Sequence, residues 1–149
     1  MVALFPGHAA QEVEAALAAA HIDGRVAVLD NARLARHLAG AGRSVVCVGP
    51  AARGLKRAKT PAVAALPGAL PLAGAAFAAL VAGGLAQTDS WQTLLDEWCR
   101  AVAPGGLVVI VDRGAAAELS RRALCGGLTA VEQRAAGRTV ITAGRWHPL

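Results

Sequence analysis

Aromatic residues are scarce in this chain of 149 residues, which has three Trp, two Phe and no Tyr. Proteins that bind single-stranded nucleic acid stack its bases on aromatic side chains, so this composition disfavours such a surface. Long hydrophobic runs are also missing, because no segment reaches the roughly 20 apolar residues that a membrane-spanning helix needs. The first residues, MVALFPGHAAQEVEAAL, lack the basic start and the long apolar stretch of a secretory signal. We therefore expect a cytoplasmic protein that does not enter a membrane.

Cysteine and histidine are few and scattered. The three cysteines, Cys47, Cys99 and Cys125, lie far apart, and no two of them have the spacing of metal ligands. Each stands among apolar residues, so we expect free, buried thiols of the kind found in a reducing compartment. The four histidines are equally dispersed. The sequence therefore predicts no metal site.

Acidic residues are absent from one long segment. Between Asn31 and Thr88 there is no Asp or Glu, although the same segment holds seven Lys and Arg residues. This distribution gives part of the surface a positive potential, which attracts acidic partners, phosphates or nucleic acid. A basic surface that is simply solvated is the other interpretation. If residues 33–59 do bind a polyanion or another protein, the candidate residues are Arg33, Arg36, Arg53, Lys56 and Arg57.

What the chain does contain favours one α/β domain. Its residues are 55% hydrophobic and 17% charged, as in a globular protein with a real core. Short apolar runs typical of buried strands alternate with segments of helical periodicity. We expect strands at 25–29, 44–48, 63–66, 77–83 and 107–112, the last one after a turn at 104–106. We expect helices at 8–20, between 31 and 42, and at 51–58, 90–103 and 115–126.

The last part of the chain has a different pattern. The segments LTAVEQRA (128–135) and RTVITAGRW (138–146) alternate apolar and polar residues around Gly137, which predicts an antiparallel hairpin. Together with the alternating strands and helices, this indicates a Rossmann-like α/β fold with a mostly parallel sheet and helices on both faces. We expect a single domain over 1–149, made of a helical extension at 1–24 and a core at 25–146.

Ligands of parallel α/β sheets bind at the carboxyl ends of the strands. If the chain binds a cofactor there, the candidate binding residues are those at the strand ends: Asp30, Asn31, Gly49, Pro50, Gly83 and Gly84. Asp112 ends the most hydrophobic strand, where it either lines a cleft or fixes a turn. The sequence has no nucleophile elbow and no P-loop. We therefore assign no catalytic residue.

One stretch resembles a known family. Between residues 70 and 111, a Leu-Pro-Leu segment, a strand that begins at Phe77, a helix and the turn Val102-Ala-Pro-Gly-Gly106 follow one another in the order typical of class I S-adenosylmethionine (SAM)-dependent methyltransferases. The likeness extends from about Arg25 to Trp146. It implies the methyltransferase fold and SAM as cofactor, with a glycine-rich loop after the first strand and an acidic residue at the end of the second that holds the ribose hydroxyls.

The chain departs from this pattern at the cofactor site. Only Asp-Asn-Ala-Arg separates Leu29 from Leu34, so the glycine-rich loop is missing, and Gly49 stands where the ribose-binding acid is expected. The third strand region offers no acid or amide, and Ala78 replaces an Asp that is common in the fourth strand. We therefore expect a degenerate methyltransferase-like domain that binds no SAM.

Three functions follow from this comparison. The first is a protein-interaction or scaffolding module without cofactor, whose partner is another protein or a second copy; an exposed Trp91 would mark such an interface. The second is an active SAM-dependent methyltransferase in which the strand-end residues listed above hold the cofactor atypically. The third is a non-catalytic binder of nucleic acid or another polyanion through residues 33–59.

Overall fold

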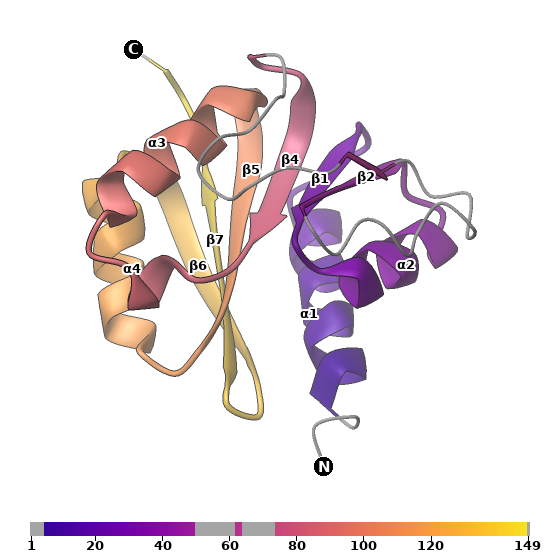
Figure 1. Cartoon of the computed structure of the whole chain (residues 1–149), viewed down its shortest axis with the longest axis horizontal. Coiled ribbons are helices and arrows are strands. Elements are labelled where there is room, and N and C mark those ends of the chain that lie inside the picture. The colour runs from indigo at the N-terminus through magenta and orange to yellow at the C-terminus, as the bar shows by residue number, and fades with distance from the viewer. Residues whose placement is uncertain (1–4, 50–61, 64–73, 149) are drawn as a thin grey trace.

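The computed structural model describes residues 5–49, 62–63 and 74–148. In these residues four α-helices, one short 3-10 helix and seven strands follow one another (Figure 1). The first half contains α1 (Phe5–Ala19), β1 (Val26–Leu29), α2 (Ala32–Gly40), β2 (Val45–Val48), β3 (Ala62–Val63) and β4 (Phe77–Ala82). The second half contains the 3-10 helix η3 (Leu85–Gln87), α3 (Trp91–Ala101), β5 (Val102–Arg113), α4 (Ala116–Cys125), β6 (Thr129–Ala136) and β7 (Thr139–Arg145).

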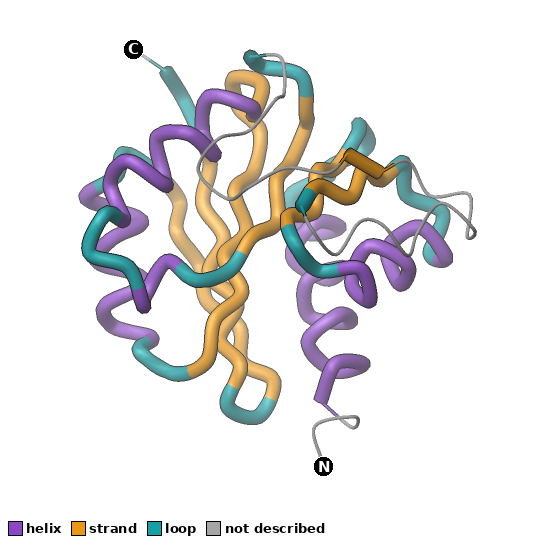
Figure 2. Tube along the Cα trace, in the orientation of Figure 1, coloured by secondary structure: helices purple, strands orange, loops and turns teal. Residues whose placement is uncertain are grey.

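The strands form one sheet in the order β3-β2-β1-β4-β5-β7-β6. The first five strands of the chain pair in parallel, whereas β7 runs antiparallel to both β5 and β6. Figure 2 shows the sheet between two groups of helices. The predicted α/β fold, with a mostly parallel sheet, helices on both faces and a C-terminal antiparallel hairpin, is confirmed.

Two layers of side chains hold the helices to the sheet. One face of the sheet packs against α1 and α2, and the other packs against α3 and α4. Val26, Ala27 and Val28 of β1 are fully buried, because a central parallel strand is covered on both faces. Val13 and Leu17 of α1 are also fully buried in the first layer. The segment predicted as an N-terminal extension therefore shares the core of the domain.

Two predictions were wrong in detail. The turn predicted at Pro104-Gly105-Gly106 lies inside β5, because Val102 already pairs with Phe77 and pairing resumes at Leu107 with Ala79 after an irregularity. Cys125 is exposed at the end of α4, while the other two cysteines are buried as expected. We expected the Cys125 thiol to be buried because its neighbours in the sequence are apolar. It is exposed instead, because Leu119 and Ala123 form the buried side of that helix.

Several expected features fall outside the described residues. These are the helix at 51–58, residues 64–66 of the predicted third strand, and the side chains of Pro50, Arg53, Lys56 and Arg57. Within the described part of the chain, none of the helices is both long and apolar enough to span a membrane.

Candidate functional site

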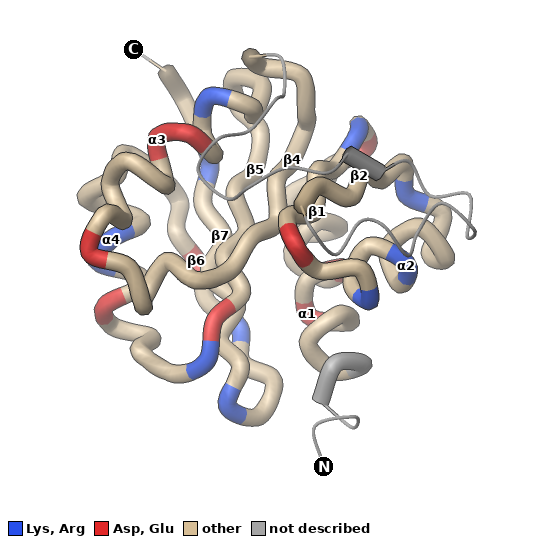
Figure 3. The backbone as a smooth tube through the Cα atoms, viewed as in Figure 1, with Lys and Arg blue, Asp and Glu red and all other residues tan. Residues whose placement is uncertain are grey.

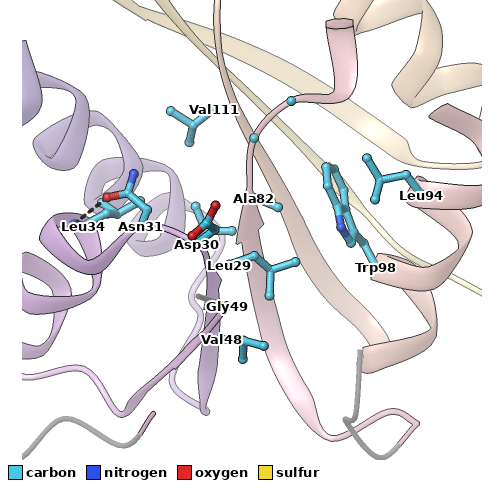
Figure 4. Close-up of a pocket in the computed structure, with 13 residues that line it drawn as sticks. Leu29, Asp30, Asn31, Leu34, Val48, Gly49, Ala82, Leu94, Trp98 and Val111 are labelled. Atoms are coloured by element: carbon cyan, nitrogen blue, oxygen red, sulfur yellow. Dashed lines mark hydrogen bonds between the residues drawn. The ribbon is translucent and has the colours of Figure 1, made fainter. Parts of the chain in front are cut away.

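A cavity of about 330 Å³ opens at the carboxyl ends of β1, β2 and β4. It extends from the start of α2 to the inner side of α3, with Asn31 and Leu34 at one end and Leu94 and Trp98 at the other (Figure 4). The volume lies near the lower limit of the 300–1,000 Å³ typical of small-molecule sites. The remaining described lining residues are Leu29, Asp30, Val48, Gly49, Val81, Ala82, Gly83, Gly84 and Val111.

The connection from β1 to α2 has only two residues, Asp30 and Asn31. The Asn31 side chain caps α2, because its Oδ1 accepts a hydrogen bond from the backbone N–H of Leu34 at 3.0 Å. The backbone N–H of Asp30 donates to the carbonyl oxygen of Val48 at 2.6 Å, which ties this connection to the end of β2. The first turn of α2 therefore directly follows the strand end, where the methyltransferase resemblance places a glycine-rich loop.

Gly49 packs against the backbone of this connection. A Cβ atom added to Gly49 would lie 3.1 Å from Asp30 Cα and 3.2 Å from Asp30 Cβ, and Gly49 has φ +130°. Both facts favour glycine here. Asp30 therefore lies against the place where the Cβ atom of an acid at position 49 would be, so a side chain here is sterically disfavoured.

The opposite wall is held by two charged side chains. The buried Asp112 carboxylate accepts hydrogen bonds from the backbone N–H groups of Gly84, at 2.5 Å, and Ala86, at 3.1 Å. Arg122 of α4 donates through Nη1 to the carbonyl oxygens of Leu85, at 2.7 Å, and Thr88, at 2.9 Å. Of the two possibilities for Asp112, the structure shows the second: it fixes the turn after β4.

Gly83 is also explained by packing. A Cβ atom on Gly83 would lie 2.5 Å from the carbonyl oxygen of Val111 on the neighbouring strand. Glycine is therefore required for β4 and β5 to approach each other here.

The structure brings together five of the six predicted binding residues. Asp30, Asn31, Gly49, Gly83 and Gly84 all line the cavity, and Pro50 lies outside the described residues. Sequence reasoning missed the apolar part of the lining and Trp98 above all. The Trp98 side chain is 2% exposed, and its Nε1–H has no acceptor among the described residues. In the sequence, the helical spacing of Trp98 from Trp91 predicts a buried core residue and gives no sign that it borders a cavity.

The predicted interaction residues lie apart from one another. Arg33 and Arg36 are exposed on α2, and Figure 3 shows basic positions along this helix in blue. Trp91 is half-buried, and the guanidinium carbons of Arg121 and Arg122 lie 5.9 Å and 5.5 Å from its ring centroid. This ring therefore contacts α4 of its own chain, and its role in binding a partner stays a prediction.

Ionisable groups are few around the cavity. Among the described lining residues Asp30 alone has an ionisable side chain, and it is exposed. Burial raises the pKa of the Cys47 thiol on β2, and it raises the pKa of Cys99 on α3 to about 12. These two thiols are therefore protonated at neutral pH and are poor nucleophiles. The described residues contain no cluster of side chains that could hold a metal ion.

Solved structures share this fold. A 1,6-didemethyltoxoflavin-N1-methyltransferase of Burkholderia thailandensis superposes with a TM-score of 0.77 over 94% of this chain and 79% of its own, at 17% identity. A SAM-dependent methyltransferase of Thermotoga maritima has a TM-score of 0.73 at 14% identity and covers 95% and 89% of the two chains.

A third structure is a complex of the Trm112 methyltransferase activator with a methyltransferase from Haloferax volcanii. Its matching chain has a TM-score of 0.71 at 14% identity and covers 86% of this chain and 84% of its own. No protein-family model and no curated protein sequence matches the chain. The fold is that of the SAM-dependent methyltransferases, as the sequence resemblance implies.

Proposed function

We propose that this protein uses the methyltransferase fold as a binding scaffold and neither binds SAM nor transfers methyl groups. The observation that carries this proposal is the contact between Asp30 and Gly49. It lies at the edge of the cavity where the family resemblance implies both a glycine-rich loop and a ribose-binding acid, and it leaves little space for a side chain at position 49. SAM joins adenine, ribose and a methionine portion, and the two elements that the resemblance implies for holding it are both missing from the sequence.

The polar groups near the cavity support the same conclusion. The Asn31 side chain caps α2, and the Asp112 carboxylate holds the turn after β4. The glycines at 49 and 83 have steric roles in strand packing, so their presence needs no cofactor to explain it. Without SAM, the fold would act by binding. One neighbour of the same fold is a methyltransferase in complex with a protein activator, which makes a protein partner a reasonable expectation.

The direct test is isothermal titration calorimetry with SAM and with its demethylated product, S-adenosylhomocysteine. We expect no saturable heat with either compound up to millimolar concentration, and a circular-dichroism spectrum of a folded α/β protein in the same sample. Micromolar binding of either compound would refute the proposal.

A second candidate is SAM binding in an atypical manner, which one specific observation favours. The Asp30 Cβ atom lies 3.2 Å from the place where a side chain at position 49 would begin, so its carboxylate can take the place of the missing acid. In that case SAM would bind, and Asp30→Asn would weaken its affinity by about tenfold or more, because an amide replaces a carboxylate that accepts two hydrogen bonds.

A further inference from the structure

Strand β6 forms one edge of the sheet. It pairs with β7 on one side and, among the described residues, with no strand on the other. Along its middle, Glu132, Gln133 and Ala135 are exposed, and Val131 and Arg134 are partly exposed. The edge of a sheet presents backbone N–H and C=O groups that can pair with a further strand, and natural proteins usually cover or block it. The outer side of β6 is therefore a surface to which a second strand can be added.

The hydrogen bonds of β7 show which backbone groups of β6 face this edge. Trp146 directly after β7 donates to Gly106, and Arg138 directly before it accepts from Gly114, both at 2.9 Å and both on the β5 side. Between these positions β7 pairs with β5 without a register shift. Backbone groups alternate in direction along a strand of an antiparallel sheet. The even-numbered residues of β7 therefore bond to β5, and the odd-numbered residues bond to β6.

In β6, Glu132 and Arg134 are the partners of odd-numbered residues of β7. Their backbone groups are thus already bonded within the chain. Gln133 stands between them and Ala135 follows, so the N–H and C=O groups of these two residues point away from β7 and toward the open edge. Neither residue forms a backbone hydrogen bond to any other described part of the chain. These outward groups are the ones that a further strand would bond.

The side chains of β6 carry opposite charges on the face that α1 covers. Arg134 Nη1 lies 3.7 Å from Glu12 Oε2 of that helix. Glu132 lies on the same face, because alternate residues of a strand point to the same side, and its carboxylate has no hydrogen bond or ion pair with any described residue. Both charged residues border a cavity of about 190 Å³ beside Ala16 and Ala19. These small side chains leave room for groups from another chain.

Two copies of β6 can pair with each other in a way that satisfies these groups. When antiparallel strands are related by a twofold axis at Gln133, its outward N–H and C=O bond to those of the partner's Gln133. Glu132 then lies opposite the partner's Arg134, and by symmetry Arg134 lies opposite the partner's Glu132. Opposite charges directly across a strand pair stabilise it. The unpartnered carboxylate of Glu132 thus gains a cation.

The same charges disfavour the neighbouring arrangements. Sliding one strand by two residues is the smallest shift that keeps the outward backbone groups opposite one another. In one direction this shift places Glu132 opposite the partner's Glu132, and in the other it places Arg134 opposite the partner's Arg134. Like charges directly opposite each other destabilise a strand pair. The charge pattern of β6 therefore selects the pairing that is centred on Gln133.

We propose that two copies of this chain form a symmetric dimer in which their β6 strands pair antiparallel about Gln133. This goes beyond the proposed function because it assigns the partner, a second copy, and the surface that it binds. It does not rest on the absence of SAM, since none of the described residues that line the cavity at the ends of β1, β2 and β4 belongs to β6.

Exchange of the two charges tests this arrangement, by sedimentation velocity of the full chain from micromolar to millimolar concentration. We expect the unmodified protein to dimerise as its concentration rises. Glu132→Arg and Arg134→Glu each place like charges opposite each other at both symmetric positions, so each should weaken the dimer by about tenfold or more. The double variant, Glu132→Arg with Arg134→Glu, again has opposite charges across the interface and should dimerise nearly as tightly as the unmodified protein.

Asp96→Arg is the matched control, because it changes the net charge by the same amount as Glu132→Arg. Asp96 is exposed on α3, whose buried side chains pack on the other face of the sheet. This variant should dimerise like the unmodified protein. Circular dichroism of every variant checks that it is folded.

Amide hydrogen exchange locates the interface in the unmodified protein without any substitution. We expect the amides of Gln133 and Ala135 to exchange rapidly in dilute protein and slowly at the concentration where the dimer forms. The amides of Glu132 and Arg134 should be protected at both concentrations, because they are bonded to β7 in the monomer.

Three results would overturn the proposal: a protein that stays monomeric up to millimolar concentration, a dimer in which the amides of Gln133 and Ala135 remain unprotected, or a double variant that dimerises no more tightly than the single variants. The calorimetry with SAM is independent of all three. A monomer that binds no SAM would refute the dimer and leave the proposed function intact, and a dimer that binds SAM would do the reverse.

Discussion

The two walls of the cavity are built in different ways. At the ends of β1 and β2, backbone lies against backbone: a two-residue connection, a capped helix and a glycine in contact with Asp30. After β4, a longer turn is held by hydrogen bonds to two side chains, Asp112 of β5 and Arg122 of α4. The comparison teaches that one strand-end acid, Asp112, fixes its wall through a buried carboxylate, whereas the other, Asp30, is exposed and joins its wall through the backbone.

The largest expected effect on stability distinguishes the two strand-end acids, Asp112 and Asp30. Asp112→Ala removes a buried carboxylate that accepts two backbone hydrogen bonds, and leaves both donors without a partner. We expect a loss of about 3 kcal/mol in the free energy of unfolding. The matched variant Asp30→Asn should change it by no more than about 0.5 kcal/mol. Urea unfolding of both variants checks this difference, and equal losses would show that the walls do not differ as described.

Gly49 provides the next test. Gly49→Asp introduces the acid that the family resemblance implies, but φ +130° and the contact with Asp30 oppose any side chain here. We expect a loss of about 2 kcal/mol from backbone strain, and no gain of SAM binding by calorimetry. Gly49→Ala is the control and should lose a similar amount, because the Cβ atom causes the strain. A stable Gly49→Asp protein that binds SAM would contradict the steric explanation.

A smaller effect is expected at Arg122. Arg122→Met keeps the apolar stem but removes the two hydrogen bonds to the carbonyl oxygens of Leu85 and Thr88, together with the hydrogen bond to Glu118 that Arg121 also makes. We expect a loss of about 1 kcal/mol and faster amide hydrogen exchange confined to residues 84–90. Arg121→Met is the control, since its ion pair with Glu118 is exposed and such pairs contribute little. Unchanged exchange in Arg122→Met would mean that Asp112 alone holds this wall.

The smallest expected effect is on the stability of the protein at low pH. Hydrogen bonds from Arg121 and Arg122 lower the pKa of Glu118 to about 2. A carboxylate whose folded-state pKa is depressed stabilises the protein above its unfolded pKa, and this contribution is lost as pH falls toward the folded value. Between about pH 5 and pH 2, the unmodified protein should therefore lose more stability than Glu118→Gln. Urea midpoints at three pH values in that window measure this, and parallel curves would contradict it.

The architecture could be predicted because its signals are local. Buried parallel strands such as residues 26–29 appear as short continuous apolar runs, and the C-terminal hairpin appears as alternation on both sides of Gly137. The turn predicted at Pro104-Gly105-Gly106 was wrong because the pairing of Val102 with Phe77 involves residues distant in sequence. A local Pro-Gly-Gly signal cannot reveal that β5 continues through it.

The site could be predicted only in its outline. Strand ends gave the lining residues Asp30, Asn31, Gly49, Gly83 and Gly84, because parallel strands end at one edge of the sheet. The structural role of each residue depends on its neighbours in space, which cannot be read from the sequence. The steric role of Gly49 requires Asp30 within 3.2 Å, and the unsatisfied N–H of Trp98 is visible only once its surroundings are known.

The contact between Asp30 and Gly49 also constrains how this protein can change. Because a side chain at position 49 would lie 3.1 Å from Asp30 Cα on a strained backbone, we expect an acid there to be destabilising unless the connection before α2 is also lengthened. An insertion alone would still lack the acid, and the acid alone is destabilising, so the two changes are strongly coupled. A single substitution at position 49 therefore does not by itself produce the cofactor pattern of the family that the chain resembles.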